Sequence, residues 1–439
     1  MGRRSPLLRL LSRIARIARI ARIVGTGALV LALVATSSVS TAAETDAPAS
    51  DAARSEYRFL AGVRHPNELF TANILTGGRL ALRGVDAVTE KVEGYTTSSA
   101  AKIGLRSAVF TFVDVPILSY MLVLPHELGH AGRLREMGAE PEIHLDLPLP
   151  YSLEANHYAT HRQTRAVYAG ELSVSALGGL QAQEASQRML TWTTFRSGVL
   201  RRGEALAYAS TSVTHAFQTV GGRDFENASR LVRPLYRGDP SAYRTAARGA
   251  LLLDLVDPML LYSLYASAHR YLVRGERATR APGIEAAGAR LLATSRTLPV
   301  PWGVEHQLHV LAAWPWASFD LGVRTGVGAR GSFGVELATF DWRVLDVMRV
   351  GFDLAMWTQP LVPSAATLGE PSIVIRQSSG REDVRDRTTF GGAARLLFEV
   401  DQRMWFLGTR LGWKSVGLWG ERELAGGFEV ALTGGLKLD

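Results

Sequence analysis

Long apolar runs of helical length dominate residues 57–275. The two strongest are residues 108–125, AVFTFVDVPILSYMLVLP, and residues 245–273. Runs of this length predict helices, so this part of the chain is expected to form a mainly helical domain. Asp114 and Pro116 interrupt the first run. That run therefore predicts either a helix buried in protein or a membrane helix with a functional break, because a carboxylate in lipid needs a partner.

The pattern changes to a period of two in residues 299–439. Apolar residues there alternate with polar or small ones, which predicts roughly seven or eight antiparallel strands. Residues 276–298 are expected to link the two parts, so the predicted fold class is α+β. The clearest strand is VGFDLAM, whose apolar side chains share one face: Val350, Phe352, Leu354 and Met356.

This β part resembles a small outer-membrane β-barrel in its pattern. Such barrels have alternating segments of about ten residues and many aromatic residues near the strand ends. Eight of the nine tryptophans of the chain lie in residues 299–439. Soluble barrels and sandwiches share the alternation, so both remain alternatives. If the strands form a membrane barrel, the apolar helices should be buried in protein; if the helices span a membrane, the strands should form a soluble domain.

The first 43 residues have the order of an export signal. They contain seven arginines and no acidic residue, followed by the apolar core ALVLALVA at 28–35 and small residues at 41–43. This order predicts a cleaved signal peptide over 1–43 and a polar linker over 44–56. The protein is therefore expected to be exported to a bacterial cell envelope, where the periplasm and the outer membrane are both possible sites and membrane association is expected.

Charge and cysteine content restrict the chemistry. The formal net charge is +8, and seven of these charges belong to the first 43 residues, which leaves about +1 for the rest. The body of the chain therefore gives no reason to expect nucleic-acid binding. The chain has no cysteine. Disulfides and thiolate ligands are excluded, so any metal site must use His, Asp and Glu.

The sequence HELGH at residues 126–130 follows the first apolar run. His126 and His130 are one helical turn apart, so both imidazoles are expected on one face, where they can bind one zinc ion. Glu127 is expected to act as the general base on a metal-bound water. Gly138 predicts the end of this helix.

HELGH and the following AGRLREMG resemble the motif helix of the site-2-protease family of zinc peptidases. The resemblance covers residues 108–140 and implies that His126 and His130 are ligands and Glu127 is the base. It also implies an Asp ligand from a later apolar helix, for which Asp257 and Asp254 are candidates. Asp257 precedes a proline, so a helix N-cap is the alternative role for this residue.

A second comparison favours a Glu as the third ligand. Thermolysin-like gluzincins use a Glu on a helix downstream of the two histidines, and Glu184 occupies such a place, with Glu171 as the second choice. Gly178 and Gly179 precede Glu184 and weaken the predicted helix, so the expected reason for them is either close packing against another helix or a break beside a site. Glu184 is ranked slightly ahead of Asp257.

The predicted function is that of an exported zinc metallopeptidase. Zn²⁺ would be held by His126, His130 and Glu184, Glu127 would activate the water, and the substrate would be a protein or peptide. The alternative is a non-catalytic envelope or outer-membrane β-barrel protein in which the metal-binding helix is structural.

Overall fold

The computed structural model describes most of the chain after residue 54. All described residues fall within the compact unit Asp51–Asp439. The predicted signal peptide and nearly all of the predicted linker over 44–56 lie outside the described residues. The described ranges are 55–62, 66–145, 158–162, 167–368, 386–420 and 422–438.

Helices occupy most of the stretch from residue 66 to residue 274, as the apolar runs predicted. Two π-helical segments, η1 and η2, continue α3 and α9 without a break. The helices are α2 (Pro66–Glu93), α3 (Ser99–Val109), η1 (Phe110–Asp114), α4 (Val115–Glu136), α5 (Ala169–Ser197), α6 (Arg202–Gly221), α7 (Arg223–Tyr236), α8 (Pro240–Leu255), α9 (Pro258–Tyr265), η2 (Ala266–Arg274) and the short α10 (Ala365–Leu368).

A ten-stranded antiparallel sheet forms the other layer, with the strand order β1-β14-β13-β12-β11-β10-β9-β8-β7-β6. Two small two-stranded antiparallel sheets, β2-β3 and β4-β5, accompany the helices. The fold is thus α+β, as predicted. The strands are β1 (Ser55–Gly62), β2 (Glu140–His144), β3 (Tyr158–Arg162), β4 (Val199–Arg201), β5 (Ala278–Arg280), β6 (Ile284–Ala286), β7 (Ala289–Val300), β8 (Gly303–Ala313), β9 (Ser318–Gly328), β10 (Ser332–Leu345), β11 (Met348–Pro360), β12 (Thr388–Asp401), β13 (Trp405–Lys414) and β14 (Gly427–Leu438).

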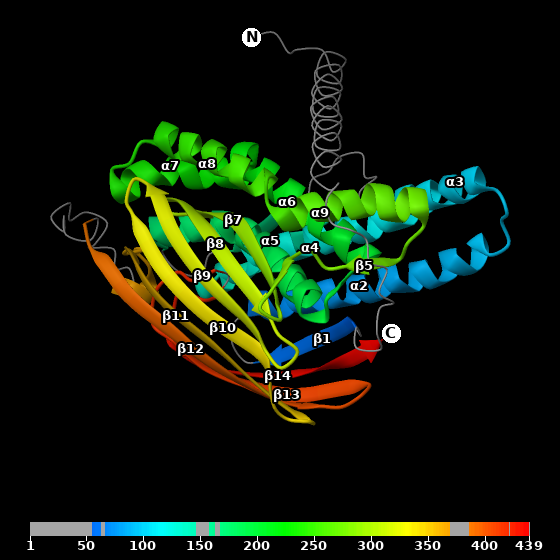
Figure 1. The fold of residues 1–439 in the computed structure, drawn as a ribbon. Coiled ribbons are helices and arrows are strands. Elements are labelled where there is room, and N and C mark those ends of the chain that lie inside the picture. The colour runs from blue at the N-terminus through cyan, green and yellow to red at the C-terminus, as the bar shows by residue number, and fades with distance from the viewer. Residues whose placement is uncertain are drawn as a thin grey trace, which may run out of the picture. The chain divides into compact units, whose positions relative to one another are not determined.

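The helical and β parts are layers of one unit. β1 precedes all the helices, yet it pairs along its whole length with β14. The helices lie over the concave face of the curved sheet (Figure 1). The predicted boundary between a helical domain over 57–275 and a β domain over 299–439 is therefore a boundary between layers, and the predicted linker over 276–298 contains β5, β6 and most of β7.

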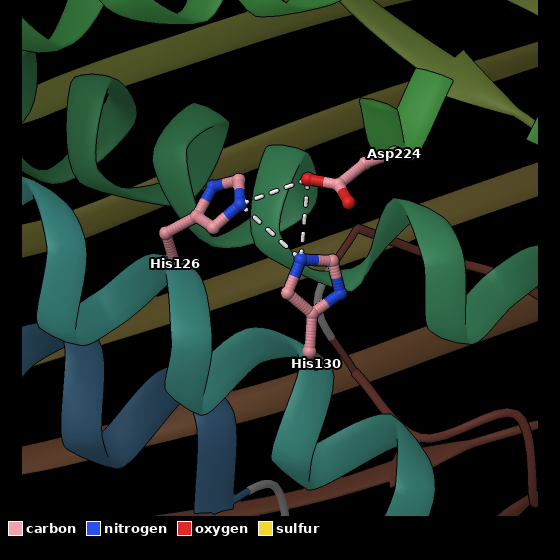
Figure 2. Close-up of side chains that lie close together, drawn as sticks. All are labelled: His126, His130 and Asp224. Atoms are coloured by element: carbon pink, nitrogen blue, oxygen red, sulfur yellow. Dashed lines mark hydrogen bonds and ion pairs between the residues drawn. The ribbon is translucent and has the colours of Figure 1, made fainter. Parts of the chain in front are cut away.

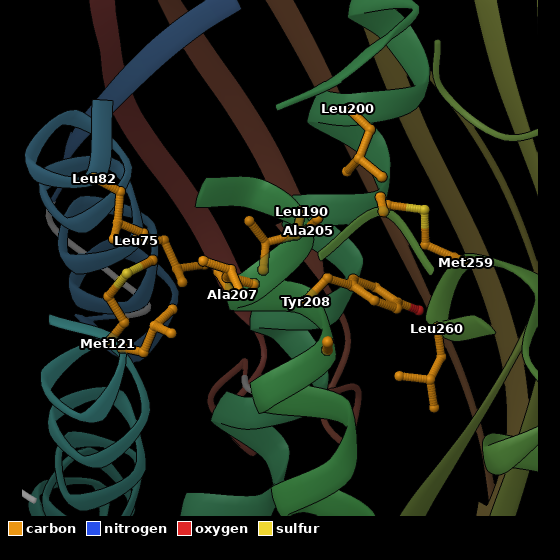
Figure 3. Close-up of a cluster of buried hydrophobic side chains, with 14 residues drawn as sticks. Leu75, Leu82, Met121, Leu190, Leu200, Ala205, Ala207, Tyr208, Met259 and Leu260 are labelled. Atoms are coloured by element: carbon orange, nitrogen blue, oxygen red, sulfur yellow. The ribbon is translucent and has the colours of Figure 1, made fainter. Parts of the chain in front are cut away.

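A cluster of buried apolar side chains holds the helices together. It joins α2, α4, α5, α6 and α9 through residues such as Leu75, Met121, Leu190, Tyr208 and Leu260 (Figure 3). Burying a side chain of this size contributes about 1.5–3 kcal/mol. This cluster fixes α4 against α5, the two helices on which the site described below depends.

The apolar run at residues 108–125 spans η1 and most of α4. The continuous helix Ser99–Glu136 is long and apolar enough to cross a membrane, and 17% of its most apolar window is buried. Asp114, which interrupts the run, is fully buried and pairs with Arg202, which also pairs with Asp86. The carboxylate thus has the partner that its position in an apolar run requires.

Candidate metal centre

α4 presents the HELGH motif as the sequence predicted. The Nε2 atoms of His126 and His130 lie 3.2 Å apart, which confirms that the two imidazoles share one face of the helix. The helix ends at Glu136, and Gly138 adopts a left-handed φ of 72°. The predicted helix end at Gly138 is therefore also confirmed.

The third group at this position is Asp224, near the N-terminus of α7 (Figure 2). Its Oδ2 lies 2.9 Å from Nε2 of His126 and 3.3 Å from Nε2 of His130. Three potential ligand atoms from two helices thus form a triangle. The side chain of Asp224 is 28% exposed, whereas those of His126 and His130 are 8% and 12% exposed. The site can therefore be reached by solvent on the side of Asp224.

The dimensions and chemistry of this triangle fit a zinc ion. Ligands bound tetrahedrally at about 2.0–2.1 Å lie about 3.3 Å from one another. The three edges measure 2.9, 3.2 and 3.3 Å. Two imidazole nitrogens and one carboxylate oxygen are also a donor set typical of catalytic zinc sites, which leave the fourth position open.

The tautomer of His130 is set by the neighbouring helix. Its Nδ1 lies 2.7 Å from the carbonyl oxygen of Ser175 on α5, which can only accept, so Nδ1 carries the proton. The lone pair of His130 is then on Nε2, toward His126 and Asp224. A hydrogen bond of this kind from the remote nitrogen is the usual support of a metal-binding histidine.

The cluster attracts positive charge. Burial lowers the pKa of His130, but the hydrogen bond and charge of Asp224, together with the charge of Glu127, outweigh it and raise that pKa to about 9. Burial raises the pKa of Asp224, but hydrogen bonds from His126 and His130 hold it well below its usual range. A proton held between these groups occupies the place that a metal cation would take.

Glu127 is buried beside the histidines. It is 5% exposed, and among the described residues its Oε2 has no hydrogen-bond partner. An unpaired buried carboxylate oxygen is costly unless a ligand or water satisfies it. Oε2 of Glu127 therefore has the capacity to accept a hydrogen bond from a water.

Two glycines of α5 allow α4 to approach closely. A Cβ atom on Gly178 would lie 2.6 Å from the carbonyl oxygen of Gly129, and a Cβ on Gly179 would lie 2.5 Å from Nε2 of His126. Real Cβ atoms essentially never approach so closely. Of the two reasons predicted for these glycines, close packing against another helix is the one that the structure shows; α5 continues through both glycines, so the predicted break is absent.

Glu184, predicted as the third ligand, lies elsewhere on α5. Its Oε1 is 3.5 Å from the guanidinium of Arg296, and Glu184 does not belong to the cluster of His126 and His130. Glu171 accepts hydrogen bonds from the backbone N–H groups of Tyr168 and Ala365. The structure thus puts Asp224 in the position that the sequence analysis gave to Glu184.

The two aspartates of the later apolar helices also have other roles. Asp257 is the N-cap of α9, where it accepts from the N–H of Leu260 and from the hydroxyl of Tyr208. This is the N-cap role considered from the sequence. Asp254 accepts a hydrogen bond from Thr297.

Sequence reasoning missed Asp224. The only local signal is a Gly-Gly pair at 221–222 followed by an acidic residue in the first turn of a helix. Acidic residues are common in first turns because they complement the helix dipole. The signal therefore does not distinguish a ligand from an ordinary helix start.

A second cluster on the sheet, His309, Asp320 and Glu336, fits an ion-pair network better than a metal site. Nδ1 of His309 lies 2.9 Å from Asp320 and 3.4 Å from Glu336. The guanidinium of Arg188 lies 2.7 Å from Glu336. A cation bound here would face that guanidinium, whose charge already compensates the carboxylates.

Comparisons with known proteins give little further information. No family model and no curated protein matches the chain. A solved structure of the NanC porin in a rhombohedral crystal form aligns with 37% of this chain and 77% of its own chain, at 8% identity and a TM-score of 0.24.

Proposed function

We propose that this protein is a zinc-dependent metallopeptidase of the bacterial cell envelope that hydrolyses peptide bonds in a protein or peptide substrate. The observation that carries the proposal is the convergence of His126, His130 and Asp224, with the buried Glu127 next to His126 in the chain and its Oε2 without a hydrogen-bond partner among the described residues. The donor set of two His and one Asp is also what the resemblance to the site-2-protease family implies. Here, however, the Asp comes from the start of α7.

The roles of the residues follow from their positions. A Zn²⁺ ion bound by His126, His130 and Asp224 would polarise a scissile carbonyl and lower the pKa of a water. Oε2 of Glu127 would accept a proton from a water whose oxygen adds to the carbonyl carbon. Glu127 would then give this proton to the amide nitrogen as the C–N bond breaks. Ser175 keeps His130 in its ligating tautomer throughout.

The test is the substitution Glu127→Gln in the full chain loaded with zinc. We expect hydrolysis of an unfolded protein such as casein to fall at least about 100-fold, because a positioned general base contributes that much or more. Zinc content should stay near one equivalent, since Glu127 is not a ligand. Glu142→Gln, at a site whose side chain is 79% exposed, is the matched control.

Two results would contradict the proposal in different ways. Cleavage by Glu127→Gln at the parental rate would remove Glu127 from the chemistry. A parent protein that binds zinc through these residues but cleaves no peptide bond would leave the metal-binding helix with a structural role.

A further inference from the structure

The outward face of strands β8–β14 is apolar and exposed. In β12, for example, Leu396, Phe398 and Val400 are 49%, 40% and 47% exposed. The same holds on the neighbouring strands, except at the start of β8, where Val304 is buried against side chains of α7 and α8. The exposed aliphatic residues on this face are Leu308, Val310, Leu321, Val323, Val335, Leu337, Leu354, Met356, Leu396, Val400, Leu407, Leu411, Val430, Leu432 and Leu436.

The charged residues of these strands occupy the opposite, concave face. Arg395 and Glu399 alternate with the apolar residues of β12 and are buried, with ion pairs to Glu68 and Arg58. In β11 the buried Asp353 pairs with Arg422. A water-soluble antiparallel sheet has the reverse arrangement, with apolar residues on the core side and polar residues toward solvent.

The apolar face is large. Strands of ten to fourteen residues form it. Seven strands spaced about 4.8 Å apart, each contributing about ten residues at 3.3 Å, cover roughly 1,000 Å². The largest apolar patch of a soluble monomer is about 300–600 Å². An apolar face of this size is expected to be covered by lipid or by another molecule.

Aromatic residues lie in two belts along the two ends of the strands. One belt lies at the end of the sheet where β10 begins. There Phe333 of β10 and Phe390 of β12 both pair with Thr358 of β11, and Trp413 of β13 pairs with Phe428 of β14. The opposite end carries Trp316, Trp342 and Trp405, each 45–49% exposed. The aliphatic residues lie between the belts.

This banding identifies the occupant. Aromatic belts on both sides of an aliphatic band are the pattern of a surface in contact with a bilayer, where the rings lie at the headgroup level. The eleven residues from Phe390 to Val400 span about 33 Å along the strand, which suits an apolar band about 25 Å tall when the strand is tilted. A protein partner of the same area would need no such order along the strands.

We propose that the outward face of β8–β14 is embedded in a lipid bilayer, with acyl chains against the aliphatic band and the two aromatic belts at the headgroups. The helices and the metal centre lie on the concave side, away from this lipid-facing surface (Figure 1). The inference does not depend on zinc or on peptidase activity.

The absence of cysteine makes a direct test possible. Single cysteines at Leu396, Leu354 and Leu432 of the full chain are labelled with a fluorophore, and each variant is reconstituted into vesicles of phosphatidylcholine and phosphatidylglycerol. Lipids that carry a nitroxide in mid-chain should remove most of the fluorescence at these sites. At Phe390 and Phe428, nitroxide at the headgroup should quench more strongly than nitroxide in mid-chain.

The matched control is a cysteine at Arg230 on α7, whose side chain is 70% exposed. Its label should be quenched by aqueous iodide and not by either lipid. Circular dichroism identifies any variant that has lost its fold, and the neighbouring outward site then replaces it.

Three results would overturn the proposal. One is a set of sheet labels that iodide quenches and lipid does not. Another is a protein that stays monomeric in buffer and does not enter vesicles. The third is efficient disulfide cross-linking between two copies through Leu396→Cys in the absence of lipid, which would make a second copy the occupant.

Discussion

The substitution Gly179→Ala tests the geometry of the metal centre without altering a ligand. The added Cβ would lie 2.5 Å from Nε2 and Cε1 of His126. An ordinary contact is at least about 3.4 Å, so the imidazole must move by about 0.9 Å. Metal ligands tolerate displacements of about 0.2 Å, and disturbance of the groups that support a ligand typically weakens binding by about 10–100-fold. We therefore expect the zinc dissociation constant to rise by about 10–100-fold.

The matched control is Gly84→Ala on α2. A Cβ there meets no atom within 4 Å. Both substitutions place an alanine inside a helix, where alanine is more favourable than glycine by about 1 kcal/mol. Gly84→Ala should therefore raise stability slightly and leave zinc binding unchanged. In Gly179→Ala, overpacking of about 1–3 kcal/mol opposes the same gain.

The assay is competition for zinc with a chromophoric chelator, with circular dichroism and thermal unfolding measured on the same samples. The informative result is a loss of zinc affinity in a variant that keeps the parental helix content. If Gly179→Ala is folded and binds zinc within twofold of the parent, His126 is not held against α5 as described, and the assignment of the site fails.

Three further predictions concern the remaining acidic and basic groups. Asp224→Asn should lose tight zinc binding, as measured by the same competition, whereas Glu184→Gln should keep it; the opposite result would restore Glu184 as the ligand. Burial raises the pKa of Asp254 to about 7 from 3.8, so ionisation of this group lowers folding stability as the pH rises from 4 to 7. Asp254→Asn should therefore melt at a higher temperature than the parent at pH 8, with the difference shrinking toward pH 4, and equal melting temperatures at pH 8 would refute the assignment. Arg202→Met leaves Asp114 buried without its cation and should lower the free energy of unfolding by about 3–5 kcal/mol in chemical denaturation, while a loss under 1 kcal/mol would show that the pair is not buried as described.

Local periodicity predicted the long helices and the strands after residue 299, but not β1 or the strands β5–β7 of the predicted linker. The alternation of Val350, Phe352, Leu354 and Met356 predicted one strand with these side chains on one face, and β11 places them so. Alternation alone does not say which face of a strand points outward. The pairing of β1 with β14 could also not be predicted from the sequence, because it joins residues 369 to 383 positions apart, from Gly62 with Ala431 to Ser55 with Leu438, and has no local signal.

Part of the metal centre could likewise be predicted from local sequence, and part depends on contacts between distant segments. The spacing of His126 and His130 is a property of one helix, so it was predictable. Asp224 reaches them only because α7 packs against α5, and no local pattern encodes that contact. Glu184 is on the helix that touches His126, but five residues beyond Gly179, which is about 7.5 Å farther along the axis. Glu184 therefore lies more than one turn beyond the site, and the third group of the cluster comes from α7 and not from α5, the helix on which it was predicted.

The apolar run of η1 and α4 and the outward face of the sheet are both hydrophobic, yet they call for different environments. A carboxylate in the middle of a membrane helix costs about 3 kcal/mol, and Asp114 stands in the middle of the run. In the folded chain the ion pair with Arg202, a residue of α6, offsets this cost. Protein therefore covers the run on the side of Asp114. The described outward side chains of β9–β14 include no comparable charge, and no described element covers them. We therefore propose the strands as the lipid-facing surface, while the helix that carries His126 and His130 packs against α2 and α5 with 17% of its apolar window buried.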